Sequence, residues 1–166
     1  KMERAHYNMA IAYQCTAKFR KAIGQFKRMI PLLKKRAVYS EMHIIYNNIG
    51  GCYLSLDQYE EARIWFDKSL DAHSRFDPTS PVGVLLMNIG MVSIKLHQFV
   101  EAVQFLERAR DEFVSTQGMS SEYLEPILNH LNFAKDMIKV VAEGGDTTQA
   151  LETLHFKPMH SGITGD

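Results

Sequence analysis

Apolar residues recur at helical spacing in two stripes within each of three consecutive 40-residue segments. In the middle segment the first stripe follows i, i+4, i+7, i+8 and i+11 and consists of Ile45, Ile49, Cys52, Tyr53 and Leu56. The pattern breaks at Asp57-Gln58 and then resumes as a second stripe of Tyr59, Ala62, Phe66 and Leu70. Stripes of this period indicate amphipathic helices. The break between them predicts two antiparallel helices joined by a short turn.

The three segments share fixed columns when they are aligned at an offset of 40 residues. One column holds small residues (Ala10, Gly50, Gly90), a second holds alanine (Ala22, Ala62, Ala102) and a third holds large apolar residues (Phe26, Phe66, Leu106). Small residues let two helix backbones approach, and the large side chain fills the neighbouring space. A constant period with such columns is the signature of a stacked repeat protein. The sequence therefore predicts an all-α array of helix hairpins, which offers a binding surface rather than a catalytic pocket.

The boundaries of the units follow from glycine and proline. We expect one domain over residues 1–154, with repeats at about 3–42, 43–82 and 83–120, a capping helix at about 121–143 and a short helix at 148–154. Pro31 is expected to kink or break the second helix of the first repeat near Ile30. Ser121 is a candidate N-cap, and residues 155–166 are expected to form a mobile tail. Because the chain begins with Lys1, we expect a fragment or a processed product.

The motif columns resemble those of the tetratricopeptide repeat family. Ile49-Gly50-x-x-Tyr53 followed by Tyr59-x-x-Ala62-x-x-x-Phe66 is similar to its L-G-x-x-Y and A-x-x-x-F pattern. The departures from this pattern are His6 and Tyr46 in the usual Trp column, Ser93 in place of Tyr, and Arg110 at the end of the last stripe. The long repeat, with Tyr46-Asn47-Asn48-Ile49-Gly50, resembles the repeats of kinesin light chains and Pins-type scaffolds. The resemblance implies an α-α superhelix of three repeats and a cap, whose inner face is lined by the first helices.

The inner positions implied by the family register form the candidate partner-binding site. They are Tyr7, Asn8 and Ile11 from repeat one, Ile44, Asn47 and Asn48 from repeat two, and Val84, Met87, Asn88 and Met91 from repeat three. Asparagine recurs in one column as Asn8, Asn48 and Asn88. A carboxamide can bond both the N–H and the C=O of a peptide backbone. Helices about 8–10 Å apart would place one such amide at roughly every third residue of an extended peptide. The alternative is that these asparagines bond neighbouring helices and shape the superhelix.

The family's chaperone-binding members suggest what this groove does not bind. They clamp a C-terminal carboxylate with Lys and Asn on the first repeat and with Lys and Arg on the third. The matching positions here are Tyr7, Ile11, Val84 and Asn88, and only Asn48 agrees with the clamp pattern. We therefore expect no binding of Hsp70 or Hsp90 C-terminal tails.

The zero net charge conceals a strong asymmetry along the chain. Residues 1–40 carry ten Lys or Arg and one acid, hence +9, and residues 41–166 carry nine basic and eighteen acidic residues, hence −9. A basic helix can meet an acidic partner, an anionic lipid or nucleic acid. The alternative is a solvated outer face whose counter-charge lies on the adjoining acidic repeat. Phe19 and Phe26 fall in core columns instead of among the exposed lysines, which argues against stacking on bases.

No constellation of residues indicates catalysis. Phosphate loops, nucleophile elbows and calcium loops are absent from the sequence. The histidines include no i, i+4 pair, so we expect no metal and no cofactor. Cys15 and Cys52 suggest two reduced, partly buried thiols, and apolar runs are too short for a membrane span. We expect a non-enzymatic cytoplasmic adaptor or scaffold that binds a protein or peptide. The alternatives are a self-associating scaffold that forms a homo-oligomer and a peptide-sensing regulatory domain.

Overall fold

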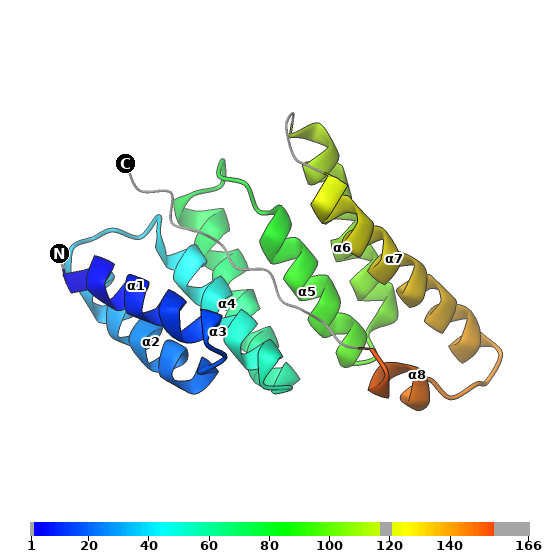
Figure 1. The fold of residues 1–166 in the computed structure, drawn as a ribbon. Helices are drawn as coiled ribbons and strands as arrows, with labels where there is room; N and C mark the ends of the chain where they lie inside the picture. The colour runs from blue at the N-terminus through cyan, green and yellow to red at the C-terminus, as the bar shows by residue number, and fades with distance from the viewer. Residues whose placement is uncertain (1, 117–120, 155–166) are drawn as a thin grey trace. The chain divides into compact units, whose positions relative to one another are not determined.

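The computed structural model describes residues 2–116 and 121–154, which form eight α-helices and no strand (Figure 1). The helices are α1 (Met2–Cys15), α2 (Phe19–Lys35), α3 (Met42–Ser55), α4 (Tyr59–Phe76), α5 (Gly83–Lys95), α6 (Phe99–Ser115), α7 (Ser121–Ala142) and α8 (Thr148–Glu152). The all-α prediction is confirmed, and the predicted hairpins correspond to α1/α2, α3/α4 and α5/α6. The tail predicted for residues 155–166 lies outside the described residues.

The chain divides into two compact units between Ser80 and Pro81. Unit 1 contains the α1/α2 and α3/α4 hairpins, and unit 2 contains the α5/α6 hairpin with α7 and α8. The division falls at the proline-containing linker that separates the second and third repeats in sequence. The residue before a proline is disfavoured in the helical conformation, and in this linker α4 ends before Pro78 and α5 begins after Pro81.

Each hairpin is held by a close crossing of its two helices at the small-residue columns. The alanines at 22, 62 and 102 are 0% exposed, as are the large apolar partners Phe26, Phe66 and Leu106. A Cβ placed on Gly50 would lie 2.6 Å from the ring of Phe66, and one on Gly90 would lie 2.6 Å from Cγ of Leu106. Real Cβ atoms do not approach other atoms that closely, so hydrogen is the only substituent the crossing accepts without movement.

The turn inside each hairpin has the same backbone conformation in all three repeats. Ala17, Asp57 and His97, which are 40 residues apart, all have positive φ, at 54°, 56° and 59°. The next residue in each turn donates its N–H to the carbonyl five positions back: Lys18 to Tyr13, Gln58 to Tyr53 and Gln98 to Ser93. This is the helix-ending motif in which glycine usually supplies the left-handed residue. Here none of the three positions is glycine, so helix packing imposes the conformation.

The expected break at Pro31 does not occur, because α2 runs without interruption from Phe19 to Lys35, and the alternative of a kink near Ile30 stays a prediction. Pro31 is exposed, so the carbonyl of Lys27 that loses its helical partner lies on the side of the helix that water reaches. The turn after α2 has a further left-handed residue, Ala37 at φ 55°.

Capping interactions secure the ends of unit 2. The Glu112 carboxylate of α6 accepts the N–H groups of Val82 and Gly83 at the start of α5, which satisfies unpaired donors and favours the helix dipole. Lys95, at the end of α5, donates to the carbonyls of Leu151 and Leu154 and so anchors α8. Lys95 is therefore engaged with α8.

The C-terminal helices largely match the prediction. α7 begins at Ser121 itself, whose side chain lies outside the described residues, so its expected role as an N-cap stays a prediction. α7 ends at Ala142, just before Gly144 at φ 79°. α8 ends at Glu152, two residues earlier than expected. Asp146 starts it by accepting bonds from the backbone N–H and the hydroxyl of Thr148 at 2.9 and 2.6 Å.

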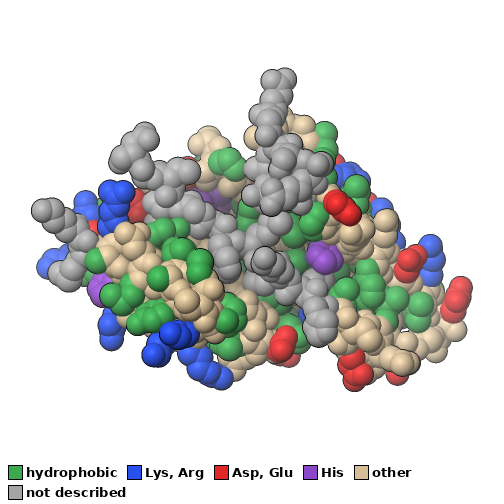
Figure 2. Space-filling view, in the orientation of Figure 1, with side chains coloured by type: hydrophobic (Ala, Val, Ile, Leu, Met, Phe, Trp, Pro, Cys, Tyr) green, Lys and Arg blue, Asp and Glu red, His purple; other side chains and the backbone are tan. Residues whose placement is uncertain are grey.

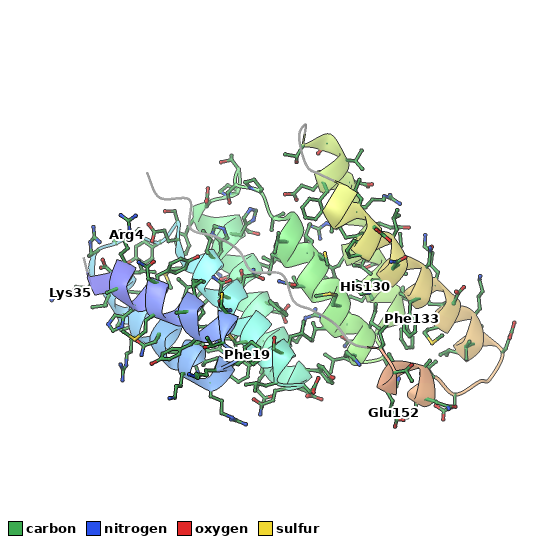
Figure 3. The ribbon with its side chains drawn as sticks, viewed as in Figure 1. Arg4, Phe19, Lys35, His130, Phe133 and Glu152 are labelled. Carbon is green, nitrogen blue, oxygen red and sulfur yellow. The ribbon has the colours of Figure 1, made fainter. Side chains whose placement is uncertain are left out.

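Two buried histidines in unit 1 and a half-buried one in unit 2 add a pH-sensitive element to the chain. In unit 1 the rings of His43 and His73 lie 5.5 Å apart and donate to the carbonyls of Ser40 and Ser80. Burial lowers the pKa of His43. In unit 2, Figure 3 places His130 on the side of α7 that faces α5, and burial there lowers its pKa to about 4. Both shifts favour the neutral imidazole in the folded chain.

The close crossing predicts opposite effects of alanine at two helical glycines. G50A should destabilise unit 1 by roughly 1–3 kcal/mol because the buried ring of Phe66 must move. Gly24 lies on the exposed side of α2, where an added methyl group would meet nothing within 4 Å, so G24A should stabilise by about 0.4–1 kcal/mol. Urea unfolding of the two variants measures both changes. Equal effects at the two positions would contradict the close-crossing interpretation.

The lowered histidine pKa values predict loss of stability in acid. Above the ordinary histidine pKa of 6.5, His130 is neutral in both the folded and the unfolded chain, so it does not lower the free energy of unfolding. As pH falls from 6.5 toward about 4, the unfolded chain binds protons that the folded chain refuses, and the free energy of unfolding declines by at most roughly 3 kcal/mol. Urea titrations across this range should show a shallower decline for H130Q than for the wild type. Parallel pH profiles would show that His130 is not desolvated in solution.

Candidate interaction surfaces

The predicted binding positions of unit 1 lie on α1 and α3 and differ in exposure. On α1, Asn8 is exposed, and Tyr7 and Ile11 are half-buried. On α3, Ile44 is half-buried, whereas Asn47 and Asn48 are 1% and 0% exposed. The accessible part of this surface, which we call the first-helix surface, therefore consists of Tyr7, Asn8, Ile11 and Ile44.

The predicted positions of unit 2 lie on α5 and are mostly covered. Val84 is half-buried, and Met87, Asn88 and Met91 are at most 1% exposed. Asn47, Asn48 and Asn88 each already have an interaction partner. The asparagine column is thus one exposed amide and two buried amides, and a ligand could touch the buried ones only by displacing the groups that cover them.

A pocket that the sequence pattern did not indicate opens on the second-helix side of unit 1. It has a volume of about 460 Å³ and is bounded by α2, α3 and α4. The residues that line this pocket, called the aromatic pocket below, are Ile30, Lys34, Tyr39, Met42, Tyr46, Trp65, Lys68, Asp71, Ala72 and Phe76. Met42 and Ala72 are buried beneath it, whereas Tyr39 and Phe76 are 38% and 46% exposed.

Aromatic rings in two pairs form the walls of the aromatic pocket. Tyr39 stacks on Phe76 with ring centroids 5.1 Å apart and planes at 24°. Tyr46 tilts against Trp65 at 5.7 Å. Tyr46 occupies the family's Trp column. Tyr39, Trp65 and Phe76 lie outside the columns that the three repeats share. Aromatic residues outside those columns were the available signal: Tyr39 and Phe76 are exposed and Trp65 is half-buried.

Lysines approach the faces of the same rings. The Lys68 ammonium lies 4.3 Å from the centroid of the Trp65 ring, and Lys27 lies 5.2 Å from it. Lys27 also donates to the hydroxyl of Tyr53 at 3.1 Å. A cation at these distances is attracted to the electron-rich face of the ring. These contacts hold basic groups around the pocket.

The basic face of the first hairpin keeps most of its charge. Figure 2 shows Lys and Arg side chains along the edge formed by α1 and α2. Arg36 pairs with Glu3 at 2.8 Å. Within residues 2–116 and 121–154 the basic residues of α2 itself form no ion pair, and counter-charge from the adjoining repeat stays a prediction.

The two cysteines differ from the prediction of two partly buried thiols. Cys15 is exposed at the end of α1. Cys52 is buried, accepts a bond from Gln14 at 3.2 Å, and burial raises the pKa of its thiol to about 12. A thiol held protonated in this way is a poor nucleophile and a poor metal ligand.

The described parts of the chain contain no group of three His, Cys, Asp or Glu suited to a metal ion. None of the helices described there is long and apolar enough to cross a bilayer.

Comparison with known proteins places these hairpins in a family. The Tetratricopeptide repeat family model matches residues 41–113, a range that holds α3, α4, α5 and most of α6. Outer dynein arm-docking complex subunit 4 of Bos taurus is 29% identical over 132 residues, which make up 79% of this chain and 18% of the bovine protein. Anaphase-promoting complex subunit 7 of Dictyostelium discoideum is 30% identical over 57 residues, or 34% of this chain and 10% of that protein. The chain thus spans less than a fifth of either relative.

Solved structures show the same fold. The Sgt2 TPR domain from Aspergillus fumigatus has a TM-score of 0.66 at 15% identity, covering 86% of this chain and 82% of that domain. BtubC (BKLC) from P. vanneervenii also has a TM-score of 0.66, at 14% identity, covering 99% of this chain and 70% of the other. We conclude that residues 41–113 match the tetratricopeptide repeat family and that the chain has the fold of solved TPR domains, which supports a scaffold for protein–protein interactions.

Proposed function

We propose that the chain is a non-enzymatic adaptor that binds an extended segment of a partner protein on the first-helix surface. The observation that carries the proposal is the accessible set Tyr7, Asn8, Ile11 and Ile44 on two consecutive first helices of a tetratricopeptide array. This set combines one carboxamide with apolar side chains, as a surface that reads both peptide backbone and side chains requires.

The exposed carboxamide of Asn8 supplies the backbone contact. It can accept an N–H and donate to a C=O of an extended peptide, whatever the peptide's side chains are. Ile11 lies one helical turn from Tyr7, so both belong to the same side of α1 and form an apolar patch beside the amide. Ile44 provides a further apolar contact from α3.

The buried asparagines have a second role in this proposal. Asn48 and Asn88 are 0% exposed and already have partners, so their first contribution is to the chain's own structure. Asn47, Met87 and Met91 are also buried, and with Val84 they complete the surface predicted from the family register. A ligand that reaches these residues must displace the groups that cover them.

The named relatives support an assembly role. Both names describe a subunit of a multiprotein complex, one for docking of outer dynein arms and one for promotion of anaphase. The proposal accordingly places this chain in a larger assembly in the cytoplasm, where Cys15 and Cys52 would remain reduced. Hsp70 and Hsp90 tails are not the proposed ligands, since the carboxylate-clamp residues are replaced.

The test uses peptides selected from a displayed random library against the whole chain. Binding of a selected peptide, measured by fluorescence anisotropy, should weaken by about 0.5–1.5 kcal/mol in N8A, the net value of one ordinary hydrogen bond. Asn129 on α7 is also exposed, so N129A is the matched control and should bind as the wild type does.

Thermal melts separate folding from binding in the same variants. N8A and N129A should melt like the wild type, because exposed substitutions change stability by roughly 0.5 kcal/mol or less. N48A should melt lower, because its partner loses a buried bond. Unchanged affinity in N8A, or no selectable peptide at all, would overturn the proposed function.

A further inference from the structure

We propose that the aromatic pocket is a second binding site, which takes a large apolar side chain from an acidic segment of a partner protein. It shares no residue with the first-helix surface, so it would give the chain two independent places to bind. The proposal rests on the shape of the pocket, its aromatic walls and the unneutralised positive charge around it.

The dimensions suit one bulky side chain. A volume of about 460 Å³ lies within the range of roughly 300–1,000 Å³ in which protein pockets bind small ligands. The floor is apolar, since Met42 and Ala72 are both 4% exposed. A phenylalanine or leucine entering between the Tyr39–Phe76 and Tyr46–Trp65 pairs would cover aromatic surface that water now contacts.

The positive charge around the pocket favours a bound segment with acidic residues next to its apolar side chain. Lys34 and Lys68 line the pocket, both exposed, and Lys27 lies beside Trp65. Asp71 is the acidic residue among those that line the pocket, and Arg75 already pairs with it at 2.8 Å. The remaining field is positive and continuous with the basic face of α2. Glutamate or aspartate next to the apolar anchor would complement it and speed association.

A concave pocket fits a peptide better than it fits nucleic acid or a membrane. Stacking of bases needs open aromatic faces, whereas Lys68 and Lys27 occupy the vicinity of the Trp65 ring and Tyr39 is stacked on Phe76. Membrane contact needs a broad apolar face, whereas the apolar floor of Met42 and Ala72 is buried and only Tyr39 and Phe76 are exposed large apolar residues among those lining the pocket. A single side chain on an extended segment can enter where neither of the others can.

Trp65 provides the readout because it is the only tryptophan in the chain. The probe is a glutamate-rich peptide, blocked at both ends, with one central phenylalanine and no tryptophan. We expect a saturable change in Trp65 emission that weakens as salt is added. The same peptide with serine in place of phenylalanine should give no saturable change.

Charge reversals test the flanking contacts. K34E/K68E should bind the phenylalanine peptide about tenfold more weakly, because two attractive contacts become repulsive. Lys21 and Lys35 are exposed on α2 outside the pocket, so K21E/K35E changes the net charge equally and should bind within about twofold of the wild type. N8A should bind this peptide normally, so failure of the first-helix proposal and failure of this one are distinguishable.

Four results would overturn the proposal. They are no saturable change with the phenylalanine peptide, an equal response to the serine peptide, equal weakening in both double variants, and a stronger response to phosphatidylserine vesicles or a single-stranded oligonucleotide than to the peptide. The second would show that no side chain enters the pocket, and the third would show only general attraction between opposite charges. The fourth would reassign the site to lipid or nucleic acid.

Discussion

The close packing of a small residue on the first helix against a large side chain on the second, inside each hairpin, is the constraint on which the other features depend. It requires hydrogen at Gly50 and Gly90, where a methyl group would collide with Phe66 and Leu106. It also requires the fully buried alanine of each second helix. Once the two helices cross at that distance, the directions of all other side chains follow from helical periodicity. In the first hairpin Tyr7 packs against Phe26 while Asn8 is exposed, and in the second Trp65 and Lys68 lie on one side of α4.

Sequence periodicity can predict the hairpins because the small and large residues that pack together recur at fixed positions in each repeat. The small and large columns recur at a stride of 40, and each member lies in the core position expected of it. The end of the first helix is also predictable in the middle repeat, since Asp57-Gln58 interrupts the apolar stripe where α3 gives way to α4. The helix does not break at Pro31, because the effect of this proline depends on whether water reaches the freed carbonyl, and the sequence alone does not show which side of the helix is exposed.

The candidate surfaces are less accessible to sequence reasoning, for a different physical reason. Asn8 and Asn48 occupy the same column, yet one is exposed and the other is fully buried. Their environments differ because α3 packs against both α2 and α4, whereas α1 packs mainly against α2. The aromatic pocket joins Ile30, Tyr39, Tyr46 and Phe76, which come from three helices and a turn. No local pattern connects such distant positions, and only the aromatic residues outside the core columns indicate them.

The left-handed residues of the hairpin turns bear on how the chain folds. Ala17 and His97 hold a conformation that costs an L-residue roughly 1–2 kcal/mol, and neither side chain has the short polar group that eases it in asparagine or aspartate. Such turns have no intrinsic tendency to close before their helices meet. In the first and third hairpins the packing of the two helices must therefore offset this cost, so the shape of the connection depends on the helix interface and not on the residues of the turn.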